Sequence, residues 1–136
     1  MSESYTPLSR EYLAGFFDGE GCVGVYSRNS NKKDTLKYFV LVCSVSQKGD
    51  AGKELLDRIK LQFEGSIYRN GSGVWQWTTS ANKADTFIRY ILPFSNIKQP
   101  QLLKALSFQE LPKKTFDFPE AVSLAQDIMN LKRGII

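Results

Sequence analysis

The stretch of sequence that decides the fold is Tyr12-Leu13-Ala14-Gly15-Phe16-Phe17-Asp18-Gly19-Glu20-Gly21. Gly15 and Gly19 stand four positions apart, so in a helix they share one face and let another backbone come very close. A glycine inside a helix costs roughly 0.5–1 kcal/mol relative to alanine, so two of them need a compensating contact. The glycine face therefore predicts close packing, either within the chain or against a second copy of this helix.

Two acids follow that face directly. Asp18 and Glu20 lie where the helix ends, and the helix macrodipole is negative there. A carboxylate is poorly placed at that end unless a cation compensates for it. Close packing and misplaced acids together predict a metal ion at a helix–helix interface, and the alternative is a solvated helix end without a metal.

The rest of the chain predicts an α+β fold in a single domain of residues 1–136, since no repeat or linker divides it. A helix begins near Ser9 and ends around residues 19–21. Gly71-Ser72-Gly73 predicts a hairpin. Apolar spacing predicts further helices over residues 51–63, 83–91, 99–110 and 119–131, and strands over 22–28, 37–46, 66–70 and 74–78. The order predicts an antiparallel four-stranded sheet with helices on one face.

Composition narrows the chemistry. The 136 residues include no histidine, so catalysis would lack the usual general base for neutral pH. The remaining candidates for catalysis are carboxylates that hold a metal ion, with Lys or Gln nearby. The two cysteines form no CxxC pattern, so zinc and a structural disulfide are not expected. No apolar stretch reaches about 18 residues, so no membrane span is expected.

Positive charge is local. The net charge is +4, and residues 28–48 contain five basic residues against one acid. This concentration favours a polyanionic partner. Residues 1–4 lack the basic and apolar regions of a signal peptide, so we expect an intracellular protein, in the cytoplasm of a prokaryote or in an organelle.

Residues 12–21 resemble the LAGLIDADG signature of the homing endonucleases, and the later elements follow in that family's order. The resemblance implies an αββαββα core with a saddle-shaped sheet and C-terminal helices. It also implies a site-specific endonuclease that makes metal-dependent double-strand breaks in a long DNA target. A single copy of the motif implies a homodimer. The expected dimer interface comprises Leu13, Gly15, Phe16 and Gly19.

The resemblance also implies a catalytic set of Glu20, Gln47 and Lys98. Glu20 is the expected metal ligand, with the backbone carbonyl of Gly19, and Asp18 is either a second, weaker ligand or a mainly structural acid. Gln47 matches a water-ordering Gln, or is a plain strand-end amide. Lys98 matches a charge-stabilising Lys, or is a solvated surface lysine. Mg²⁺ is expected, with Mn²⁺ or Ca²⁺ as substitutes and Ca²⁺ non-productive.

One position departs from the family pattern. Close relatives carry an Arg a few residues after the Gln, whereas this chain reads Asp50-Ala51-Gly52. Lys48 or Lys53 is the expected substitute.

The sheet face away from the helices is expected to read double-stranded DNA in the major groove. Trp75 and Trp77 are assigned to the core side, although the opposite assignment is open. Arg28 and Gln76 suit guanine and adenine edges, and Lys32, Lys33 and Arg69 suit phosphates. The expected DNA contacts are Gly24, Tyr26, Arg28, Ser30, Lys32, Lys33, Tyr38, Val40, Ser44, Ser66, Tyr68, Arg69, Asn70, Gln76 and Thr78.

Two other functions stay open at this point. One is a maturase of the same fold that binds its host intron RNA. The other is a DNA-binding regulator that has lost its active site. The presence of Glu20, Gln47 and Lys98 argues against the regulator, because a pure DNA-binding protein needs none of them.

Overall fold

The computed structural model describes residues 6–29 and 37–134. The predicted order of helices and strands is confirmed, and the predicted ends differ by only a few residues. In chain order the elements are α1 (Arg10–Glu20), β1 (Gly21–Asn29), β2 (Lys37–Lys48), α2 (Gly49–Phe63), β3 (Ser66–Arg69), β4 (Val74–Ser80), α3 (Ala81–Ile91), the 3-10 turn η1 (Leu92–Phe94), α4 (Gln99–Gln109) and α5 (Pro119–Lys132).

The four strands form one antiparallel sheet in the order β1-β2-β4-β3. Gly21 pairs with Val45, so the start of β1, directly after α1, lies beside the end of β2. β4 pairs only with the second half of β2, from Val42 to Lys48. β2, with 12 residues, is the longest strand of the sheet, and its first half has no pairing with β4.

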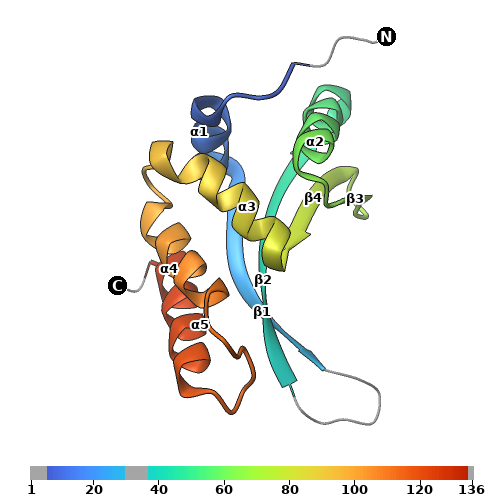
Figure 1. The fold of residues 1–136 in the computed structure, drawn as a ribbon. Coiled ribbons are helices and arrows are strands. Elements are labelled where there is room, and N and C mark those ends of the chain that lie inside the picture. The colour runs from blue at the N-terminus through green and yellow to red at the C-terminus, as the bar shows by residue number, and fades with distance from the viewer. Residues whose placement is uncertain (1–5, 30–36, 135–136) are drawn as a thin grey trace.

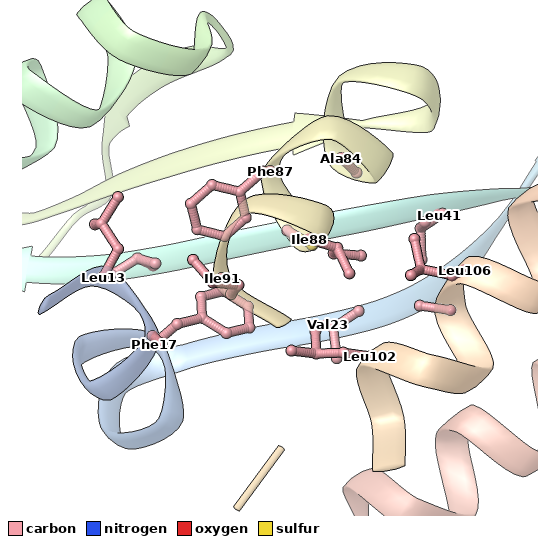
Figure 2. Packing of buried hydrophobic residues seen from close by; sticks show 14 of the residues in the cluster. Leu13, Phe17, Val23, Leu41, Ala84, Phe87, Ile88, Ile91, Leu102 and Leu106 are labelled. Atoms are coloured by element: carbon pink, nitrogen blue, oxygen red, sulfur yellow. The ribbon is translucent and has the colours of Figure 1, made fainter. Parts of the chain in front are cut away.

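The core lies between the sheet and the helices α1, α2, α3 and α4, which cover one of its faces (Figure 1). Strand alternation sends Val23, Leu41 and Val45 to this side, where they are almost completely buried. Figure 2 shows Phe17 of α1 and Phe87 of α3 meeting within this core, with ring centroids 5.4 Å apart. α5 packs against α4 and against the edge strand β1.

Helix α1 carries apolar side chains on two faces, and only one of these faces is buried in the core. The Ser9 side chain accepts the Tyr12 N–H and starts the helix. Leu13, predicted at the dimer interface, is completely buried in the core of its own chain, so that prediction was wrong. Leu13 and Phe17 are four residues apart and share the core face (Figure 2). Tyr12 and Phe16, also four residues apart, stack on each other on a different face.

The link between α2 and β3 requires glycine. Gly65 has φ +94°, and a Cβ there would lie 2.6 Å from the Thr78 carbonyl oxygen. Just before it, the carbonyl of Glu64 accepts the Nε1–H of Trp77 at 2.8 Å. Trp77 is fully buried on the helix side and Trp75 is partly buried there, so the predicted side of both rings is confirmed.

No helix in the described part of the chain combines the length and the apolar character that spanning a membrane requires. Cys22 and Cys43 are free thiols. Cys43 is buried beneath the helices, and burial raises the pKa of its thiol.

Candidate nucleic-acid interface and metal centre

One face of α1 is left uncovered. Tyr12 is 49% exposed, and its ring stacks on Phe16 with centroids 6.1 Å apart. A Cβ added at Gly15 or Gly19 would meet no atom within 4 Å. Within residues 6–29 and 37–134, nothing packs on these glycines, so close packing inside one chain does not explain them. We call Tyr12, Gly15, Phe16 and Gly19 the glycine face.

Asp18 has a structural role. Its Oδ2 accepts the backbone N–H groups of Asn96 at 2.8 Å and Ile97 at 3.3 Å, and its Oδ1 accepts that of Lys98 at 3.1 Å. These groups lead into the N-terminus of α4, where the helix macrodipole is positive. Asp18 is thus compensated by a helix terminus, and the expectation that both acids require a cation was wrong for this one.

Glu20 differs from Asp18 in its exposure and in its hydrogen bonds, the two properties that decide whether a carboxylate can bind a metal ion. It is the last residue of α1, its side chain is exposed, and it has no hydrogen bond or ion pair with any described residue. An uncompensated carboxylate remains at the negative end of the helix, directly beside the glycine face. Its neighbour Gly19 exposes its backbone at the same point.

Lys98 is brought directly to this end of α1. Its Nζ donates to the Asp18 backbone carbonyl at 2.7 Å, and Lys98 itself is partly buried. The reading of Lys98 as a freely solvated surface lysine therefore fails. The ammonium group is instead bound to the backbone carbonyl of Asp18, the residue directly before Gly19.

Gln47 lies at the same end of the sheet, two residues beyond the Gly21–Val45 pair. Its Nε2 donates to the Ser46 carbonyl at 2.8 Å, and it forms no hydrogen bond with Glu20 or Lys98. Gly52 of α2 packs against it so closely that an added Cβ would lie 2.7 Å from the Gln47 Cβ. The start of α2 thus limits where the Gln47 side chain can go.

The two lysines considered in place of the missing Arg differ in availability. Lys53 donates to both carboxylate oxygens of Asp57, at 2.9 and 3.0 Å, and lies 5.1 Å from the centre of the Trp75 ring. Lys48 is exposed at the start of α2. Lys53 is already engaged, which leaves Lys48 as the available cation.

The sheet face away from the helices carries most of the described side chains that were predicted to read DNA, and we call it the groove face. The register aligns them in rows across the strands. One row joins Arg28 to Tyr38, and the next joins Tyr26 to Val40. Further rows towards α1 comprise Ser44, Thr78 and Ser66, then Ser46, Gln76 and Tyr68. The predicted inward and outward alternation is confirmed, and all these side chains are at least partly exposed.

Arg28 lines a polar hollow on this face, of about 300 Å³, together with Val42, Ser66, Thr78 and Ser80. One guanidinium nitrogen of Arg28 donates to the Ser27 carbonyl at 3.1 Å. Its other donors have no partner among the described residues, so they are available to a ligand.

Some predicted contacts differ in their surroundings. Gly24 is buried rather than open, because the Tyr26 side chain folds over it, with the hydroxyl 3.3 Å from where a Cβ would stand. Arg69 is exposed, but it is the direct strand partner of Trp75 and its guanidinium lies 5.6 Å from that ring centre, so its side chain lies on the helix side of the sheet and not on the groove face. Asn70 closes that hairpin by donating its N–H to the Val74 carbonyl. Three predicted contacts, Ser30, Lys32 and Lys33, lie outside the described residues.

A comparison with protein families matches the LAGLIDADG endonuclease model to residues 13–112. The chain belongs to the LAGLIDADG endonuclease family. No curated protein matches it. The matched region begins inside α1 and runs through both halves of the sheet to the end of α4.

Solved structures of homing endonucleases share the fold. I-CvuI, in complex with its target in the presence of Ca, is 22% identical, with a TM-score of 0.75 over 90% of this chain and 80% of that one. The archaeal intron-encoded I-Vdi141I, complexed with DNA, is 18% identical, with a TM-score of 0.71 over 90% of this chain and 82% of that one. I-SmaMI, bound to an uncleaved DNA target, is 23% identical, with a TM-score of 0.60 over 94% of this chain but only 45% of that one.

The structure adds Lys132 to the groove face of this LAGLIDADG chain. Lys132 comes from the last turn of α5, and its Nζ lies 5.9 Å from the Tyr26 ring centre. A hydrogen bond with the Cys22 side chain raises the pKa of Lys132. A basic residue in a last helical turn is common in any sequence. Only the packing of α5 against β1 brings this one to the groove face.

Proposed function

We propose that this chain is a homodimeric, site-specific homing endonuclease that hydrolyses both strands of a long DNA target with the help of divalent metal ions. One observation carries the proposal: the uncovered glycine face of α1 ends in Glu20, whose carboxylate has no partner among the described residues. A second copy of the helix would explain the open contact face. A cation would explain the uncompensated acid at its end.

The dimer follows from the glycine face. Two copies of α1 meeting through Gly15 and Gly19 can approach backbone to backbone, which a side chain at either position would prevent. Such an approach brings the two Glu20 carboxylates near the two-fold axis. Two negative charges that close repel strongly unless cations lie between them.

The donors present suit a hard divalent cation. The described part of one chain holds no cluster of three His, Cys, Asp or Glu residues, and the Asp18 carboxylate already accepts three N–H groups. Each copy would offer the Glu20 carboxylate and the Gly19 carbonyl, completed by phosphate and water oxygens. This all-oxygen set fits Mg²⁺, with Mn²⁺ or Ca²⁺ as substitutes. Bound there, the metal would lower the pKa of a water and stabilise charge on the phosphate oxygens.

The neighbouring residues supply the rest of the chemistry. Lys98, held at the Asp18 carbonyl, would place its positive charge where negative charge grows on the phosphate during attack. Gln47, restrained by Gly52, would orient the attacking water through its amide. Lys48 would take the part of the Arg that other family members carry.

The groove face would select the target. Arg28, with free donors in the polar hollow, suits a guanine edge, and Gln76 suits adenine. Lys132, at the margin beside β1, suits a phosphate. Two groove faces related by the dimer axis would cover a long site, half by each copy.

Glu20→Gln tests the proposal. The variant should lose at least about 100-fold in cleavage rate, because it removes a metal ligand without touching the groove face. Specific DNA binding should remain. Glu120→Gln, a neutralised acid in the first turn of α5, serves as the matched control and should cut normally. The substrate is the DNA that flanks the protein's own gene, incubated with Mg²⁺ or with a chelator, and the cut ends are mapped.

Cleavage by Glu20→Gln at near the normal rate would overturn the assignment of Glu20. A wild-type protein that stays monomeric at micromolar concentration and nicks no duplex in the presence of metal would overturn the whole proposal. A gel shift with the host intron RNA in the same series separates the maturase activity from the nuclease.

A further inference from the structure

The connection between α4 and α5 pairs with the first half of β2. The N–H of Phe39 donates to the Lys114 carbonyl at 2.8 Å, and the N–H of Phe116 donates to the Lys37 carbonyl at 3.1 Å. These bonds make an antiparallel bridge between Tyr38 and Thr115. β4 ends at Ser80, opposite Val42. The connection therefore occupies the place beside β2 that β4 leaves empty, as its position next to the lower half of β2 in Figure 1 illustrates.

Two contacts fix which side chains of this connection face the helices. The Phe116 ring stacks on Phe39, with centroids 4.4 Å apart, and Phe39 meets the buried Phe108 of α4 at 6.2 Å. Lys114 turns back within its own segment, where its Nζ donates to the Leu111 carbonyl at 2.9 Å. Residues 114 and 116 thus belong to the helix side of the sheet.

The alternate residues belong to the groove face. Thr115 and Tyr38 are direct partners in the bridge, so their side chains lie on the same side, opposite to Phe39. The bridge is an isolated one, and extending its register by one residue would place Lys113 beside Val40, on the groove face. Lys113 is exposed and has no ion pair with any described residue, whereas Lys53, Lys83 and Lys104 each have one.

We propose that residues 113–115 extend the groove face beside the first half of β2. Lys113 would there bind a DNA phosphate in the outer part of each half-site. The inference rests on the proposed function. Gln47 lies at the α1 end of β2, which the proposed dimer places near the two-fold axis and the centre of the target. Val40 stands seven residues from Gln47 along β2, about 24 Å at 3.4 Å per residue. At about 3.4 Å per base pair, this phosphate lies roughly seven base pairs from the centre of the target.

The chemistry of the segment agrees with a phosphate ligand. A lysine ammonium binds a phosphate as a compact point charge and needs no planar partner. The backbone bonds to β2 and the Phe116–Phe39 stack hold the segment in place before DNA arrives, so little conformational entropy is lost on binding. One group opposes binding: the Asp117 carboxylate accepts the Thr115 hydroxyl on this side and repels phosphate.

Lys113→Ala and Lys114→Ala form a matched pair. Each variant removes one positive charge from the same segment, but only the Lys113 side chain is expected on the groove face. The probe is a duplex selected from a randomised pool by the wild-type protein, and affinity is measured across a series of salt concentrations. Each lost phosphate contact should reduce the salt slope by about 0.9, so Lys113→Ala should reduce it by about two per dimer. Lys114→Ala should leave the slope unchanged, and Asp117→Asn should tighten binding.

Phosphate ethylation interference on the same duplex adds a positional readout. With the wild type, ethylation about seven base pairs from the centre should weaken binding, and with Lys113→Ala this interference should disappear. An unchanged slope for Lys113→Ala, or equal losses for both lysine variants, would overturn the inference while leaving the nuclease proposal intact. A wild-type protein that selects no duplex would overturn the proposed function and this inference with it.

Discussion

Asp18 and Glu20 lie two residues apart at the end of α1 and have different partners. Asp18 accepts three backbone N–H groups from the loop before α4, and Glu20 has no partner in the described part of the chain. The sequence places both acids at the negative end of a helix but does not say what compensates each. The positive end of α4 compensates Asp18, which leaves Glu20 as the carboxylate available to a cation.

At this scale we predict that Asp18→Asn destabilises the fold. The amide keeps only one acceptor oxygen and no charge, so at least one N–H of the group at Asn96, Ile97 and Lys98 loses its partner. The expected loss is about 1–3 kcal/mol in the free energy of unfolding, measured by urea denaturation. Glu20→Gln should leave that free energy within about 0.5 kcal/mol of the wild type. Equal stability of all three proteins would contradict the structural role of Asp18.

The element that connects packing to function is α1. Its core face, with Leu13 and Phe17, is closed by α3 and the sheet, and its glycine face is open. Four-residue spacing predicts that both faces exist. It does not predict which of two apolar faces turns inwards, since Leu13 and Phe16 are equally apolar and only the fold separates them.

Gly15→Ala should have opposite effects on the monomer and the dimer. The added methyl meets no atom of its own chain within 4 Å, so helix propensity should stabilise the monomer by about 0.5–1 kcal/mol. The same methyl would hold two copies of α1 apart and weaken the dimer at least several-fold. Sedimentation equilibrium measures the dimer, and urea unfolding at concentrations below its dissociation constant measures the monomer. A dimer of wild-type strength would show that the helices do not meet at this face.

At the scale of the whole molecule, one chain carries a single motif and a single groove face, and it spans only 45% of the I-SmaMI chain. Under the proposed function, two such chains related by a two-fold axis would form the complete enzyme. A contact made by Arg28 in one half-site would be repeated at the symmetric position in the other.

We accordingly predict a pseudo-palindromic target. Selection from a randomised duplex pool, followed by sequencing, should return two inverted half-sites with the strongest preferences where Arg28 and Gln76 meet base edges. Arg28→Ala should relax the preference at one position in each half-site and lower affinity by about 1–3 kcal/mol per contact. A target that lacks any inverted repeat would contradict a symmetric dimer.

The sequence by itself determined the order of the elements, the glycine face and the alternation of the strands, because each depends on spacing over a few residues. Only the tertiary structure decided which residues meet across the chain. Lys98 reaches Asp18 across 80 positions of sequence, Lys132 reaches Tyr26, and Thr115 pairs with Tyr38. Local periodicity carries no information about such contacts, since they depend on how α4 and α5 pack once the sheet has formed.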